Sequence, residues 1–130
     1  MNMLENDQAE QISELLEAIS KPARLRILIA IGQEEACVCH LEAVLGLRQS
    51  YISQHLMALR SAGLLETRRE GRFVYYQLDD KRILALVEGA AAIMGISAER
   101  LKSGDQPLDI ALCSCPKCKA GAFVDLLDVG

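Results

Sequence analysis

The chain has 130 residues, 51% of them hydrophobic and 25% charged, and its formal net charge is −4. This composition excludes an intrinsically disordered chain, and the length suits one compact domain with a tail. No apolar run approaches the roughly 18 residues of a membrane span, and the start lacks the basic-then-apolar layout of a secretion signal, so we expect a cytoplasmic protein.

The charge is unevenly distributed along the chain. Residues 1–20 carry five acidic side chains and no Lys or Arg, whereas residues 48–72 carry five arginines against two glutamates. An acidic total argues against nucleic-acid binding, but a local basic patch can still hold DNA phosphates. The charge therefore permits DNA binding without establishing it.

Two helices are expected before residue 33. Residues 8–20 place apolar side chains at helical spacing, which predicts an amphipathic helix. A second helix begins at Pro22, which suits a first helical turn, and stops at Gly32. The C-terminal half of this second helix is almost wholly apolar, so we expect it in the core.

Two further helices follow in the middle of the chain. A short helix is expected from about residue 39 to residue 45, with Gly46 as its C-terminal cap. A longer one is expected over residues 49–62, with Ser50 as its N-cap and Gly63 at its end. This order is that of a helix-turn-helix.

A hairpin and a last helix complete the expected domain. Residues 64–70 and 72–78 read as two strands divided by Gly71, and alternation in the second strand predicts one buried face. Residues 81–95 form a very apolar fifth helix, for which Asp79 and Asp80 serve as starting residues. Its apolarity exceeds what a small monomer can bury, so we expect a dimer through the first and last helices.

The five cysteines fall into two clusters in a chain expected to stay reduced. Dense thiols in a small cytosolic protein more often hold a soft ion than form structural disulfides. From about residue 97 the composition changes, so we expect a domain over residues 1–97 and a tail over residues 98–130. The cysteines are Cys37 and Cys39 in the domain, and Cys113, Cys115 and Cys118 in the tail.

The motifs KPARLRIL, CVCHLEAVLGL and SYISQHLMALRSAGLLETRREGRFVYYQL resemble the ArsR/SmtB family of metal-responsive repressors. The resemblance covers roughly residues 10–95 and implies a mainly α winged helix-turn-helix with a small β-hairpin wing. It also implies a homodimeric repressor that binds operator DNA without metal and releases it on binding metal. Because two subunits read the DNA, the operator should be an imperfect inverted repeat, with half-sites about one helical turn apart or a multiple of it.

A recognition helix needs small or polar side chains on its exposed N-terminal face, where they reach base edges in the major groove. The wing arginines would lie along the DNA backbone or enter the minor groove. His55 is an alternative metal ligand, but its position on the reading helix favours a contact with DNA. The expected DNA-binding residues are Gln49, Ser50, Tyr51, Ser53, Gln54, His55, Arg68, Arg69 and Arg72.

Cys37 and Cys39 stand at positions i and i+2, which lie roughly 200° apart on a regular helix. The two thiols can share an ion only where the chain enters the third helix, and thiol-type sensors of the family carry Cys-Val-Cys at this point. Those sensors usually have Asp where this chain has His40, which is a ligand, a supporting group or a surface residue.

The tail motif C-x-C-P-x-C supplies three thiolates, one fewer than a closed tetrahedral zinc site needs. The alternative to a separate zinc knuckle is one ion held by both clusters. Soft sulfur ligands rank Cd(II), Pb(II), As(III) and Hg(II) above Zn(II). With five thiolates available we favour Cd(II) or Pb(II), and As(III) or Sb(III) on three cysteines is the alternative. Family zinc and nickel sensors often use His and Asp on the last helix, and the fifth helix here has no His.

A thiol redox sensor and an enzyme are the competing functions. A thiol redox sensor of the same fold would use a cysteine pair, but such relatives place their thiols on helices of the dimer core. An enzyme has little support, because His40 is the only His or acid beside either cysteine cluster in a nucleophile–base pattern, and the sequence has no glycine-rich phosphate loop.

Overall fold

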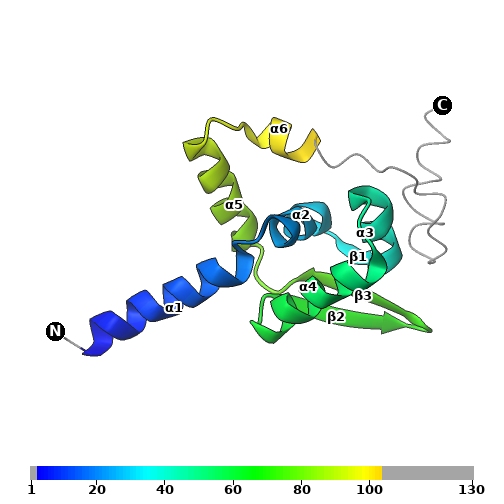
Figure 1. Cartoon of the computed structure of the whole chain (residues 1–130), viewed down its shortest axis with the longest axis horizontal. Helices are drawn as coiled ribbons and strands as arrows, with labels where there is room; N and C mark the ends of the chain where they lie inside the picture. Colours follow the sequence, from blue (N-terminus) through cyan, green and yellow to red (C-terminus); the bar gives the residue numbers. More distant parts are fainter. Residues whose placement is uncertain (1–2, 104–130) are drawn as a thin grey trace.

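The structure is a computed structural model that describes the backbone of residues 3–103 and the side chains of residues 7–101. The described chain forms a helical body with one small sheet (Figure 1). In chain order the elements are α1 (Met3–Ile19), α2 (Pro22–Ile31), β1 (Glu35–Cys37), α3 (Val38–Leu45), α4 (Gln49–Ser61), β2 (Leu65–Glu70), β3 (Phe73–Leu78), α5 (Arg82–Ile93) and α6 (Ala98–Ser103).

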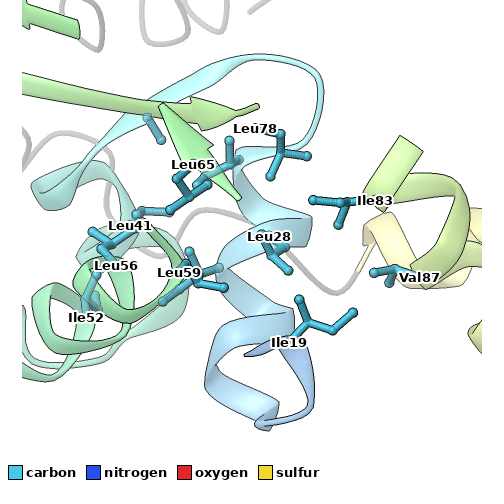
Figure 2. Close-up of a cluster of buried hydrophobic side chains, with 13 residues drawn as sticks. Ile19, Leu28, Leu41, Ile52, Leu56, Leu59, Leu65, Leu78, Ile83 and Val87 are labelled. Carbon is cyan, nitrogen blue, oxygen red and sulfur yellow. The ribbon is translucent and has the colours of Figure 1, made fainter. Parts of the chain in front are cut away.

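The central element is α2, which contacts all the other helices of the body as well as the sheet. Ile27 and Leu28 of α2 are fully buried, as its apolar C-terminal half predicts. Figure 2 shows the core around Leu28, with side chains arriving from α4, from the strands and from α5. Burial of a side chain of this size contributes about 1.5–3 kcal/mol, so this cluster fixes how α4 sits on the body.

The sheet has three antiparallel strands in the order β1-β3-β2. β2 and β3 form the expected hairpin, which turns at Gly71 (φ 61°), and β1 extends the sheet along the other edge of β3. Sequence reasoning did not predict β1, because three residues are too few to show alternation.

The expected single buried face of β3 is wrong. Tyr75 and Leu78 are the buried residues of this strand, and they lie on opposite faces of it. Leu78 joins the main core beside α2 and α4, whereas Tyr75 packs with Cys37 in a second, smaller cluster. Both faces of β3 are therefore covered.

Two helix boundaries differ from expectation. Ser50 is not the N-cap of α4, because the backbone N–H of Ile52 already donates to the carbonyl of Arg48 (3.0 Å) and the helix begins at Gln49. α6 lies just past the expected domain boundary, where Leu101 packs against the main core. The start of α5 agrees with the sequence, since Asp80 accepts a hydrogen bond from the backbone N–H of Arg82 (2.9 Å).

α1 and α5 carry apolar side chains that the single chain leaves exposed. α1 runs outward from the body, with its C-terminal end beside α2, and α5 leaves the body in another direction (Figure 1). No helix within residues 3–103 is long and apolar enough to cross a membrane. The exposed side chains on and next to these two helices are Ile12, Leu16, Leu86, Ile93 and Met94.

Candidate functional site: a reading helix, a wing and a thiol pair

α3 and α4 form the helix-turn-helix, and a glycine makes the turn between them. Gly46 adopts the left-handed conformation (φ 67°, ψ 25°), and its N–H donates to the carbonyl of Glu42 (2.8 Å). A side chain at this position would be strained, so glycine is required. α4 then buries Ile52, Leu56 and Leu59 completely, which directs the opposite side of the helix outward.

The outward face of α4 holds most of the polar residues expected to contact DNA. Gln49, Ser50, Tyr51 and Gln54 are exposed, and Ser53 is half-buried. All of them except Gln49 border a surface hollow of about 870 Å³ between the turn and α4. Arg48 and Met57, which the sequence-based set left out, line the same hollow, and Met57 is 67% exposed.

His55 does not belong to this exposed face, so that expectation is wrong. It follows the buried Ile52 by three residues, a spacing that turns its side chain inward, and it is 7% exposed. Its Nδ1 accepts a hydrogen bond from Nε of Arg24 (3.1 Å), and its ring meets Tyr51 edge-on at 4.6 Å between centroids. Its Nε2 has no hydrogen-bond partner among the described residues.

His55 is held as a neutral imidazole. Burial lowers its pKa, and the charges of Arg24 and Lys21 lower it further. The Nδ1 lone pair must stay available to accept from Arg24, which is always a donor. Arg24 also donates from Nη1 to the carbonyl of Ala18 (3.0 Å), so this arginine joins α1, α2 and α4.

The wing arginines differ in their surroundings. Arg69 and Arg72 are exposed, with the guanidinium of Arg72 over the ring of Phe73 at 5.2 Å. Arg68 is bound to Glu35 of β1, and its guanidinium lies over the ring of Tyr75 at 4.6 Å. Sequence reasoning missed Glu35, because 33 residues separate it from Arg68 and no local pattern links them.

The thiols of Cys37 and Cys39 converge where the chain enters α3, which confirms the sequence-based expectation. Cys37 is the last residue of β1 and the N-cap of α3, and its Sγ lies 3.4 Å from Sγ of Cys39. The backbone N–H of His40 donates to Sγ of Cys37 (3.4 Å). Cys37 is 3% exposed and Cys39 is half-buried.

A hollow of about 320 Å³ lies beside this pair, and it also reaches α4 and the wing. Its lining includes both thiol-bearing residues, Gln49 at the start of α4 and Arg72 near the wing tip. No group of three His, Cys, Asp or Glu side chains within the described part of the chain is arranged to hold a metal ion. The predicted tail ligands Cys113, Cys115 and Cys118 lie outside the described residues.

Residues 21–67 match the model of the arsR family of bacterial regulatory proteins. The cadmium resistance transcriptional regulatory protein CadC homolog of Staphylococcus aureus is 33% identical over 95 residues, which cover 69% of this chain and 78% of that protein. The chain belongs to the ArsR/SmtB family. The transcriptional repressor SmtB homolog of Synechocystis sp. is 41% identical over 85 residues, covering 65% of this chain and 64% of the relative's own length.

Solved structures agree with this family and fold. NolR from Sinorhizobium fredii has a TM-score of 0.67 at 32% identity, covering 75% of this chain and 97% of that one. A homodimeric winged helix-turn-helix DNA-binding domain from Mycobacterium bovis has a TM-score of 0.64 at 26% identity, covering 73% and 88%. The chain therefore has a winged helix-turn-helix fold, and its relatives are transcriptional regulators rather than enzymes.

Proposed function

We propose that this protein is a cytoplasmic homodimeric repressor that leaves its operator when its cysteine thiolates bind a thiophilic ion. The favoured ion is Cd(II) or Pb(II), with As(III) or Sb(III) on three cysteines as the alternative and Zn(II) ranked lower. The observation that carries the proposal is the 3.4 Å separation of the Cys37 and Cys39 sulfurs at the start of α3. α3 leads directly into the helix that would read DNA.

The exposed face of α4 supports DNA reading in the major groove. The side-chain amide of Gln49 or Gln54 can make two hydrogen bonds to the edge of an adenine, and the hydroxyl groups of serine and tyrosine suit phosphates. Arg69 and Arg72 are exposed wing cations that would follow the backbone, whereas Arg68, which is also exposed, is bound to Glu35. Ser50, Tyr51 and Ser53 complete the proposed contact set.

The exposed apolar side chains of α1 and α5 support dimerisation through these two helices. Ile12 is 60% exposed, Leu16 is 46% exposed and Ile93 is 85% exposed in the single chain. Covering them in a symmetric pair removes apolar area from water. A two-fold dimer places two reading helices on one operator, so we propose an imperfect inverted repeat.

The thiol pair fits a soft ion in chemistry and in spacing. Two sulfurs on one tetrahedral zinc ion at bonds of about 2.3 Å lie about 3.8 Å apart, so the two thiols need to separate by only about 0.4 Å to share an ion of that size. The larger Cd(II) and Pb(II) ions need a somewhat wider separation. Two thiolates do not complete a three- or four-coordinate site, so we propose that the tail cysteines Cys113, Cys115 and Cys118 supply the remaining ligands. The similarity to a cadmium resistance regulator supports this choice of ion.

The proposed release is a linkage between two binding events. Thiolates that close on an ion hold the junction of β1 and α3 in one arrangement, and the reading helices of the dimer then no longer match the operator. Couplings of this kind usually amount to about 1–3 kcal/mol, or roughly 5- to 150-fold in affinity. Because the linkage is reciprocal, operator DNA should weaken ion binding by the same factor.

The test is an anaerobic titration of the reduced dimer on DNA from its own upstream region with Cd(II), Pb(II), As(III) and Zn(II). DNA anisotropy and thiolate-to-metal ultraviolet absorption are followed together. Release in step with absorption at stoichiometric ion supports the proposal and names the inducer. Rising absorption with the DNA still bound would show that the cysteines are structural.

Cysteine variants separate the two clusters. Cys37→Ser and Cys115→Ser should each keep operator affinity without ion and lose most of the ion-driven release. Ser114→Ala is the matched control within the tail motif and should behave as the wild type. Loss of ion-free DNA binding in the cysteine variants would instead indicate a folding role.

Thiol oxidation is the second candidate, and the same 3.4 Å contact favours it. Joining the two sulfurs as a disulfide removes two electrons and two protons, which a peroxide or polysulfide would accept. Release by such an oxidant in the presence of a metal chelator would favour this function over ion sensing.

A further inference from the structure

The cysteine pair and the wing share one face of the sheet. Cys37 of β1 lies opposite Tyr75 of β3, and Tyr75 in turn lies opposite Arg68 of β2. Residues directly opposite one another in a ladder project from the same side. The three residues therefore form a continuous row from the thiol pair to the wing.

The middle of this row is tightly packed. Tyr75 is 1% exposed and clusters with Cys37, while Cys39 and Phe73 pack against that cluster. The guanidinium of Arg68 covers the ring of Tyr75 from the wing side. A displacement of Cys37 therefore meets a filled space, and close packing transmits it instead of absorbing it.

An ion pair crosses the same face of the sheet diagonally, from one edge strand to the other. Both carboxylate oxygens of Glu35 accept from Nε of Arg68 (3.2 and 3.1 Å), and Nη2 of Arg68 donates to Oε1 (2.5 Å). β1 and β2 are not neighbours, because β3 lies between them. Glu35 stands two residues before Cys37, so one short strand carries both the thiol and the partner of the wing arginine.

Arg68 faces away from the side of the sheet on which α4 packs. Leu65 and Leu78 line the face that joins the core with α4, and Arg69 shares that face because it alternates with Arg68. Glu35 also pairs with Arg68, so Arg69 and Arg72 are the wing arginines that we expect to offer their charge to DNA.

We infer that Arg68 is a positioning residue and not a DNA contact: with Glu35 and Tyr75 it couples the cysteine pair to the wing. In the ion-free protein the β-ladders hold the wing at the angle that fits the operator, and the Glu35–Arg68 pair links the wing to the β1–α3 junction. Movement of the β1–α3 junction shifts Glu35 and Tyr75 together, and the wing moves with Arg68. The inference rests on the proposed function, and it names how ion binding reaches the wing.

The first arm of the test measures the salt dependence of operator binding without ion. A lost phosphate contact lowers the slope of log K against log salt by about 0.9, or roughly 1.8 for a symmetric dimer. Arg69→Gln, the adjacent control, should show this loss, whereas Arg68→Gln should leave the slope unchanged. An equal loss of slope in Arg68→Gln would overturn the inference, whatever the inducer is.

The second arm measures the ratio of operator affinity without and with saturating Cd(II). Glu35→Gln should lower that ratio by a factor of about five or more, with ion-free affinity within about twofold of wild type and an unchanged thiolate absorption titration. Glu66→Gln is the matched control, because it removes the same charge from the same sheet face, where Glu66 accepts a hydrogen bond from Gln77 (3.2 Å) and not from the wing arginine. Both pairs are exposed enough that neither change should unfold the protein.

Arg68→Lys supplies a further discrimination. Lysine keeps the charge for a phosphate but loses the two-pronged donor and the flat group over Tyr75, so it should not restore the coupling. An unchanged affinity ratio in Glu35→Gln would overturn the coupling alone. A wild-type protein that keeps its DNA at saturating ion would overturn the proposed function, and the coupling with it.

Discussion

Among the polar residues of the described body, Arg24 should contribute most to the free energy of unfolding. The substitution Arg24→Met tests this. The methionine keeps the apolar stem but removes two hydrogen bonds, one to His55 Nδ1 (3.1 Å) and one to the carbonyl of Ala18 (3.0 Å). Hydrogen bonds from a charged donor contribute about 1.5–3 kcal/mol each, and the part exposure of Arg24 favours the lower end. We therefore expect the free energy of unfolding to fall by about 3 kcal/mol.

Urea unfolding at one fixed protein concentration measures this change, because the midpoint of a dimer depends on concentration. Arg26→Met is the matched control, since Arg26 lies two residues further along α2 and is exposed. The pKa of His55 should also rise in Arg24→Met, because the charge of Arg24 contributes to its lowering. Equal stability of the two variants within about 0.5 kcal/mol would refute the argument.

Three further predictions concern other parts of the molecule. Because the pKa of His55 is lowered in the folded protein, the unfolded protein takes up a proton at this histidine at a higher pH than the folded protein does. The contribution of His55 to the free energy of unfolding should therefore be fully present above about pH 6.5 and should fall as the pH drops below that value. His55→Asn, which keeps a hydrogen-bond acceptor, should weaken this pH dependence in urea titrations. Ile12→Glu with Ile93→Glu should give monomers by analytical ultracentrifugation, whereas Met57→Glu, equally apolar and exposed, should stay dimeric and lose operator affinity; a dimeric double variant would contradict the interface. At Gly71 (φ 61°) valine should cost about 1–2 kcal/mol in thermal unfolding and asparagine clearly less, so equal losses would show that φ is not the cause.

Much of the fold can be predicted from local sequence patterns. α2, α3 and α4 were predicted because each joins helical periodicity to a Pro or Gly boundary, and the hairpin because Gly71 divides two strand-like runs. The thiol pair was predicted for the same reason, since its geometry depends on three consecutive residues at a helix start. Features whose geometry depends on residues close together in the sequence can therefore be predicted from it.

Features that depend on contacts between distant segments could not be predicted from the sequence. His55 looks polar and available in the sequence, but Arg24, 31 residues earlier, binds it in the interior. Arg68 looks like one of three equivalent wing cations until Glu35 is placed beside it across the sheet. In both cases the partner comes from another element, and only the packed fold decides which polar groups remain exposed.

These distant contacts divide the domain into two parts, a helical body and a wing, which Cys37 and its neighbours connect. α3 and α4 share the main core through Leu41 and Leu56, both fully buried, so they shift together with α2. The wing is attached to this body by the β2–β3 ladder and its short connections, and by the Glu35–Arg68 pair through β1. Cys37 sits at the one residue that ends β1 and caps α3, so it belongs to both parts. Under the proposed function, an ion held there would change the angle between the reading helix and the wing, and an operator of fixed geometry would bind less tightly when that angle changes.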